Sequence, residues 1–227
     1  MCVPQQYVGQ QVIVEISGNN IRKGKLIDRG LDILVLANEQ KFYYIPLVHV
    51  QNVKVNTEPT METDDSLAET EQPSIDYQAD SLSFRKILNQ AKGRFVEIYV
   101  TGNKTIHGYL TSIMNDYFVF YSPVYKAMFI SMNHLKWLIP YPANVTPYTL
   151  DNQSLPLSLI NVTLSRTFEE QCKKLEGKLV VFDLGDNTNK IGLLNKADRN
   201  FVELINADGN KVFWNLQHLK TVCTPTA

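Results

Sequence analysis

The chain of 227 residues carries 22 Lys and Arg against 23 Asp and Glu, a net charge of −1. No apolar run approaches the roughly 20 residues that cross a bilayer, so we expect no membrane span and no membrane partner. The three cysteines are odd in number and match no zinc-ligand spacing, which is typical of free thiols in a reducing compartment. We therefore expect a protein made in the cytoplasm, with no metal and no cofactor.

One structural unit recurs three times along the chain. Its equivalent positions are spaced by 84 residues, or by 85 where one residue is inserted near Ser122 and Pro123. Because glycines, leucines and histidines all follow one period, the chain is predicted to be an array of three similar modules. The residues that define the repeat are Gly9, Gly93 and Gly177, then Gly24, Gly108 and Gly192, and finally His49, His134 and His218.

Each copy predicts the same succession of strands. An alternating strand comes first, a hairpin turn follows, and the second strand carries the repeated glycine in its middle. Glycine weakens a strand unless the chain bends or another backbone comes close. We interpret Gly24, Gly108 and Gly192 as the bend that closes a small barrel. A polar turn then leads to the third and fourth strands, and a short turn with the histidine precedes the fifth.

A helix is predicted before the strands of the second and third copies. The first helix ends at Gly93. The second begins with the capping box Thr167–Glu170 and ends at Gly177. The first copy has room for no more than a turn before its strands. The residues at helical spacing in the first helix are Phe84, Ile87, Leu88 and Ala91.

These elements predict an all-β protein with short helices, built as three tandem Sm-like or SH3-like five-stranded barrels. The barrels are expected at residues 1–56, 81–140 and 164–227. Residues 57–80 carry eight acids and no base, which is typical of a disordered linker. Residues 141–163 mix prolines with apolar residues and are predicted to lie extended on a neighbouring module. Their predicted interaction residues are Leu155, Leu157, Leu159 and Ile160.

Several short stretches carry a family resemblance. They are Lys23–Leu26, Tyr43–Ile45 and Leu47–Val53, together with the stretches around His134 and His218. They resemble the three-repeat N-terminal region of the Bacillus spore coat protein B family, without the Ser/Lys/Arg-rich tail that its members often carry. The resemblance implies a structural protein of the spore coat or exosporium, synthesised in the mother-cell cytoplasm. Its implied partners are other spore coat or exosporium proteins, or further copies of itself.

The three equivalent histidines are the candidates for metal or proton chemistry. Each lies in its own copy, without Cys, Asp or Glu at ligand spacing. We interpret His49, His134 and His218 as structural residues that tie the turn before the fifth strand to backbone groups. They should then make similar contacts in three copies of one barrel. One continuous sheet, or histidines that converge on one point, would instead favour a metal site.

No enzymatic activity is predicted, because no copy contains a nucleophile–base pair, a paired-acid site or a phosphate loop. The alternative is an Sm-like RNA-binding protein, which needs basic and stacking residues together on exposed loops. Only the second copy combines them, at Tyr121, Tyr125 and Lys126, which argues against an RNA surface shared by all three copies. We therefore predict a structural protein that assembles with other proteins through exposed strand edges.

Overall fold

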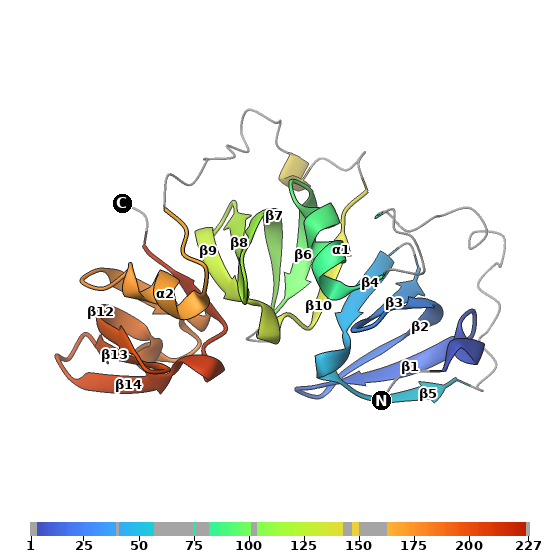
Figure 1. Cartoon of the computed structure of the whole chain (residues 1–227), viewed down its shortest axis with the longest axis horizontal. Coiled ribbons are helices and arrows are strands. Elements are labelled where there is room, and N and C mark those ends of the chain that lie inside the picture. The colour runs from blue at the N-terminus through green and yellow to red at the C-terminus, as the bar shows by residue number, and fades with distance from the viewer. Residues whose placement is uncertain are drawn as a thin grey trace. The chain divides into compact units, whose positions relative to one another are not determined.

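The computed structural model describes residues 4–39, 41–56, 75, 82–100, 104–142, 147–149 and 163–225 (Figure 1). Within these ranges the chain forms 15 strands, two short α-helices and several 3-10 turns. The prediction of an all-β protein with short helices is confirmed. No helix in the described ranges is long and apolar enough to span a membrane.

The three repeats contain the same succession of five strands. The first has a 3-10 turn η1 (Gln5–Tyr7), then β1 (Gln11–Ile16), β2 (Asn20–Arg29), β3 (Ile33–Asn38), β4 (Lys41–Pro46) and β5 (Val50–Val55). The second has α1 (Phe84–Ala91), β6 (Phe95–Tyr99), β7 (Thr105–Ile113), β8 (Tyr117–Ser122), β9 (Lys126–Ser131) and β10 (Trp137–Pro140). The third has α2 (Phe168–Lys173), β11 (Leu179–Phe182), β12 (Ile191–Asp198), β13 (Phe201–Ile205), β14 (Lys211–Asn215) and β15 (Thr221–Cys223).

Both helices form where their apolar spacing and caps predict. In α1 the residues Ile87, Leu88 and Ala91 are buried, as the helical spacing requires. At the start of α2 the Thr167 hydroxyl accepts a hydrogen bond of 3.3 Å from the Glu170 amide, which satisfies one of the free amides of the first turn. Local sequence is therefore sufficient to place both helices.

The chain divides into two compact units at points other than the predicted module boundaries. The first unit contains residues 1–91 and 136–143, and the second contains residues 92–135 and 144–227. In the first unit the strand order is β10-β4-β3-β2-β1-β5. In the second unit it is β14-β13-β12-β11-β15-β9-β8-β7-β6. Strand β10 of the second repeat therefore belongs to the unit built mainly from the first repeat.

The expected three separate barrels are not what the structure shows. Strand β4 pairs with β10, with Tyr44 opposite Leu138, and Figure 1 shows the two strands side by side. Strand β9 pairs with β15, with Phe129 opposite Val222. A barrel closes when its end strands pair with each other. Here the fourth strand of one repeat pairs with the fifth strand of the next, so these repeats are open arrays.

The repeated glycines of the second strand allow two backbones to come close. A Cβ atom at Gly24 would collide with the carbonyl oxygen of Ala37 on the neighbouring strand. The bend itself lies just beyond, where the β2–β3 register shifts between Leu26 and Asp28, and β7 and β12 have the same β-bulge. These glycines therefore serve close approach and not the bend. The equivalent collisions are of Gly108 with Tyr121 and of Gly192 with Ile205.

The repeated glycines before the first strand adopt left-handed backbone conformations. Gly9, Gly93 and Gly177 have φ of 90°, 78° and 78°, which residues with a side chain rarely adopt. The amide of Gly177 donates a 2.8 Å hydrogen bond to the Leu194 carbonyl in β12, and the other two glycines make the equivalent bond. The turn that starts each sheet therefore has the same geometry in all three copies.

The two predicted linkers lie almost wholly outside the described residues. The acidic segment 57–80 contributes Ile75, which is buried. The segment 141–163 contributes its two ends and a 3-10 turn η6 (Pro147–Thr149). The four predicted interaction residues of this segment, Leu155, Leu157, Leu159 and Ile160, lie outside the described ranges.

Candidate functional site

The three repeated histidines occupy the same turn but make different contacts. Each ends a 3-10 turn before the fifth strand, in η2 (Leu47–His49), η5 (Met132–His134) and η9 (Leu216–His218). His49 Nδ1 shares a 3.1 Å hydrogen bond with the Ser17 hydroxyl. His134 Nε2 donates a 2.8 Å bond to the Gln217 carbonyl of the next repeat. Their position is thus shared by the repeats, but their bonding is not.

The electrostatics of His134 favour a neutral ring. Burial lowers the pKa of His134, the Gln217 carbonyl partly opposes this, and nearby Lys220 lowers the pKa further. The charge of His218 also lowers it. His134 and His218 belong to the second unit, whereas His49 belongs to the first. Within the described ranges, no group of three or more His, Cys, Asp or Glu could hold a metal ion.

Cys172 and Cys223 are both buried and free. Burial raises the pKa of the Cys172 thiol far above its usual range, and burial also raises the pKa of Cys223. A thiol reacts through its thiolate, so both residues are poor nucleophiles at neutral pH. Cys172 packs in the core of the third repeat, where it acts as a small apolar side chain.

Asp183 is a buried carboxylate for which the sequence offers no signal. Its Oδ1 accepts hydrogen bonds from the amides of Lys220 and Thr221, at 2.7 and 3.0 Å, just where β15 begins. Its Oδ2 forms an ion pair with Lys190 Nζ at 2.6 Å. Burial lowers the pKa of Lys190, but the hydrogen bonds and charges of Asp183 and Asp186 together outweigh it and the pKa is raised. The Asp183 carboxylate thus has hydrogen-bond partners on both oxygens, and it holds the start of β15 in place.

The junctions between consecutive repeats are the most distinctive sites of the molecule. At the first junction β10 adds to the free edge of β4, and the Arg22 guanidinium lies 4.1 Å from the ring centre of Trp137 on β10. At the second junction β15 adds to β9 in the equivalent register. This is strand addition to a sheet edge, carried out within one chain.

Helix docking completes each junction. The first helical amide of α1, at Phe84, donates a 2.7 Å hydrogen bond to Asp32 Oδ1 of the preceding repeat. The first amide of α2, at Phe168, donates a 2.8 Å bond to Asp116 in the same way. Helices leave their first amides without internal partners, so a carboxylate there stabilises both the amide and the helix dipole. Asp32 and Asp116 are therefore docking residues for the helix of the next repeat.

The second junction buries apolar residues from the outer face of one repeat in the core of the next. Tyr117, Val119 and Phe129 of the second repeat belong to the hydrophobic core around α2 and the third-repeat strands. The Tyr117 hydroxyl donates a 2.7 Å hydrogen bond to the Ser165 carbonyl, and burial raises the pKa of Tyr117 to about 12. Strands β8 and β9 are thus packed on both faces.

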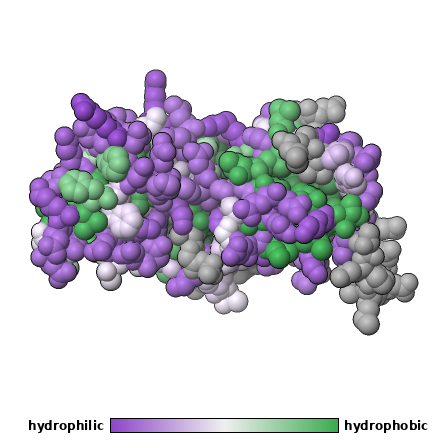
Figure 2. Space-filling view, turned by 90° about the horizontal axis from the view of Figure 1, so that it is seen from below, coloured by the Kyte–Doolittle hydropathy of each residue, from purple (hydrophilic) through white to green (hydrophobic). Residues whose placement is uncertain are grey.

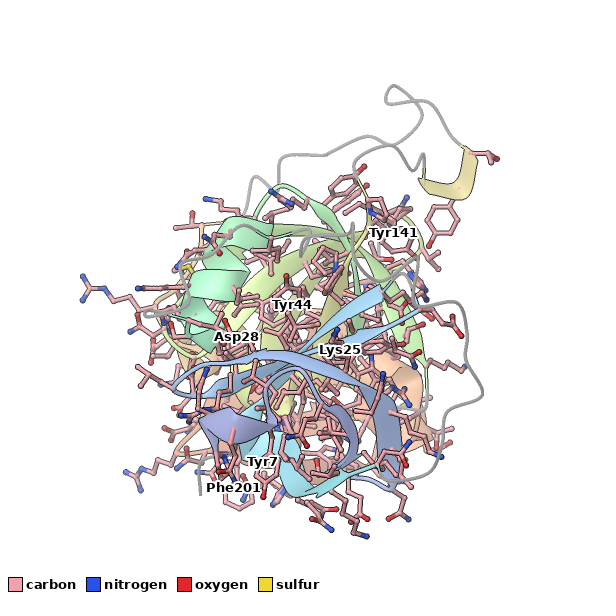
Figure 3. The ribbon with its side chains drawn as sticks, turned by 90° about the vertical axis from the view of Figure 1, so that its right-hand side faces the viewer. Tyr7, Lys25, Asp28, Tyr44, Tyr141 and Phe201 are labelled. Carbon is pink, nitrogen blue, oxygen red and sulfur yellow. The ribbon has the colours of Figure 1, made fainter. Side chains whose placement is uncertain are left out.

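The same outer face is exposed in the third repeat. Phe213 is equivalent to Tyr44 and Phe129, which are 1% and 3% exposed, yet Phe213 is 63% exposed. Phe201 is equivalent to the fully buried Tyr117, yet it is 50% exposed. Figure 2 shows hydrophobic surface on the third repeat, at left, and Figure 3 shows Tyr44 among the side chains of the first repeat. The apolar side chains beside β14 are therefore exposed, whereas their equivalents in the two earlier repeats are buried.

Among the described residues, the outer edge of β5 in the first unit is also unpaired. Strand β5 pairs with β1 on one side, and no strand in the described ranges pairs with its other side. None of its six residues is buried, whereas all residues of the equivalent strands β10 and β15 are buried. Long unpaired edges are sites where other chains can add strands. Among the described residues, β5 is therefore a fifth strand and β14 a fourth strand with one unpaired edge.

Comparisons with known proteins define the family. The chain is 47% identical over 220 residues to the uncharacterized protein YwrJ of Bacillus subtilis (strain 168), which covers 97% of this chain and 98% of that protein. The chain belongs to the YwrJ family. A family model described as the YwrJ third domain matches residues 167–222, which span the third repeat from α2 to β15.

Membership in the spore coat protein B family, which the short stretches suggested, is therefore wrong. The resemblance rested on residues such as Gly24 and the turn histidines. Gly24 lies where two backbones come too close for a side chain, and the histidines lie in a turn that all three repeats share. In this chain such residues belong to the repeated module itself. Identity along almost the whole length of a YwrJ protein is the more specific match.

Proposed function

We propose that this YwrJ-family protein is a non-enzymatic assembly protein that binds other proteins by adding strands to its free edges. Each repeat is then an open, Sm-like array whose fourth and fifth strands serve as interfaces. The observation that carries the proposal is the contrast in burial at equivalent positions. Tyr44 and Phe129 are covered by an added strand, whereas Phe213 on β14 is exposed.

Backbone pairing would supply affinity, and the side chains beside it would supply selectivity. A strand that adds to β14 would also cover Phe213, an aromatic residue of the kind that often dominates interface energetics. Two free edges on one chain allow two partners to bind at once, which favours extended assemblies. The exposed aromatic side chains then have a function that a solitary monomer would not require.

Photo-crosslinking in cells tests this proposal. A photoreactive phenylalanine analogue replaces Phe213 in one variant and Val55 in another. Leu179 and Ile21, which are also exposed but lie on β11 and β2, serve as matched controls. We expect discrete protein adducts from the two edge positions and none from the controls. Equal labelling from edge and control positions would contradict edge-strand binding.

RNA is the competing ligand, and its binding can be tested with the same purified protein. Tyr125 and Val124 are exposed beside Lys126 in the second repeat, whereas the equivalent loops of the other repeats lack this combination. Binding to single-stranded RNA would weaken steeply with added salt, because it releases counterions from phosphates. Tight, salt-sensitive binding of an unstructured oligonucleotide would favour RNA over protein partners.

A location in the spore coat or exosporium stays a prediction. The resemblance that suggested it is replaced by the YwrJ family, whose matched member is uncharacterized. Fractionation of purified spores, followed by immunodetection of the protein in each layer, tests the location directly. Absence from the spore layers would remove the location and leave the edge-strand proposal intact, since crosslinking tests that separately.

A further inference from the structure

The two free edges of the chain are complementary in kind. One molecule offers a free fifth strand at β5 and a free fourth strand at β14, and these are the strand types that meet at both internal junctions. We propose that β5 of one molecule adds antiparallel to β14 of a second copy, head to tail. This inference rests on the proposed edge-strand binding and names a second copy of the chain as the partner.

The internal junctions specify the register of this contact. Leu138 lies opposite Tyr44 at the first junction, and Val222 lies opposite Phe129 at the second. The equivalent residue of the free fifth strand is Val53, which pairs with Val14 of β1 as Val222 pairs with Phe182 of β11. The equivalent residue of the free fourth strand is Phe213.

In the intermolecular contact Val53 of one copy therefore lies opposite Phe213 of the other. A β-branched residue opposite an aromatic residue is a favourable cross-strand pair. Two positions further along, Val55 lies opposite Lys211, whose ammonium forms an ion pair of 2.7 Å with Glu203. The contact covers Phe213, which is 63% exposed, and the outer side of β5, where Val55 is 40% exposed.

The contact is smaller than an internal junction. The second and third repeats bring a helix that covers the preceding repeat, as α2 covers Tyr117. In the described residues, the 3-10 turn η1 stands before the first repeat where the others have a helix, so these residues of a second copy supply the strand but no helix to cover Phe201. Association should therefore depend on concentration. A head-to-tail contact of this kind leaves a free edge at each end and produces rings or open chains.

Sedimentation velocity and light scattering of the full chain over a range of concentrations test the proposal. We expect the mass of the unmodified chain to rise with concentration. Phe213→Asp places a charge on the β14 edge, and Val55→Lys places a second lysine opposite Lys211 of the partner. Each variant should raise the dissociation constant at least about tenfold. Phe213→Asp removes the aromatic side chain at the contact, and Val55→Lys places like charges opposite each other.

Mixing the two variants gives the decisive result. The Phe213→Asp chain keeps a normal β5 and the Val55→Lys chain keeps a normal β14, so the mixture should form a one-to-one pair and stop there. Leu179→Asp, at a position 61% exposed on β11, should associate like the unmodified chain. Circular dichroism and urea unfolding establish that each variant is folded. Slower hydrogen exchange of β14 amides at high concentration gives a second measurement that needs no substitution.

Three outcomes would overturn the inference. They are an unmodified chain that stays monomeric at every concentration, a Phe213→Asp chain that associates normally, and a mixture that fails to pair. A monomeric chain whose residue 213 still crosslinks to another protein would reject self-association and keep the proposed function. A monomeric chain with no edge-specific crosslinks would reject both.

Discussion

The outer edges of the second and third repeats have the same strand order and apolar side chains at equivalent positions, yet opposite surroundings. Tyr117 and Phe129 on β8 and β9 are covered by α2 and β15, whereas Phe201 and Phe213 on β13 and β14 are exposed. Both repeats have the same five strands. The surroundings differ because the third repeat covers this face of the second repeat.

Terminal repeats of an array usually carry a polar outer face, because nothing further covers them. In the third repeat, the last one within the described ranges, two phenylalanines lie exposed on the outer face. An exposed apolar face on a terminal repeat costs solubility unless a partner covers it. The outer face of the third repeat therefore has the apolar side chains of a repeat that another repeat covers. Both proposals rest on this observation.

The largest expected effect comes from removing a covered aromatic residue. Tyr117→Ala should lower the free energy of unfolding by about 3–5 kcal/mol, because it leaves a cavity in the shared core. The matched Phe201→Ala should change it by no more than about 0.5 kcal/mol in the monomer, because an exposed residue loses little. Urea unfolding at low protein concentration measures both, and equal losses would contradict the comparison.

A second test asks whether the interior of each repeat is independent of its position in the array. Gly24→Ala, Gly108→Ala and Gly192→Ala should each cost about 1–3 kcal/mol, because each new Cβ atom meets a carbonyl oxygen within its own repeat. Gly209→Asn serves as control, since no atom lies within 4 Å of that position and Asn tolerates its φ of 79°. Thermal unfolding that ranks the three glycines very differently would show that neighbours govern the interior as well.

A smaller effect is expected at the helix dock. Asp116→Ala removes the carboxylate that accepts the Phe168 amide and should cost about 0.5–2 kcal/mol, as the loss of a helix cap does. Asn200 occupies the equivalent place in the third repeat, with no later α-helix in the described residues. Asn200→Gly keeps its φ of 67° accessible and should leave stability unchanged in the monomer. A comparable loss from both substitutions in urea unfolding would refute a docking role for Asp116.

The smallest effect is a dependence of stability on pH at the second junction. Because burial lowers the pKa of His134 below 6.5, the unfolded chain binds a proton more readily than the folded chain. Stability from this group is present above the unfolded value and declines as pH falls below about 6.5. Unfolding curves between neutral and acidic pH should flatten in His134→Gln, which keeps a donor for the Gln217 carbonyl.

Part of the candidate site was visible in the sequence. The stretch of β8 from Tyr117 to Ser122 is apolar at almost every position, which is typical of a strand covered on both faces. That signal could have located the second junction before the fold was known. Asp32 and Asp116 could also be read as turn residues, but their role as acceptors for a helix about 50 residues later depends on the tertiary arrangement.

The sequence by itself determined the repeat, the strands, both helices and the histidine turns, because these depend on local spacing, glycine conformation and capping. The tertiary structure alone decided which edges pair. Alternation within a strand tells which side chains share a face, but the backbone groups at an edge are the same in every strand. Whether β4 pairs with β5 or with β10 therefore depends on the side chains that meet across the junction, such as Trp137 beneath Arg22.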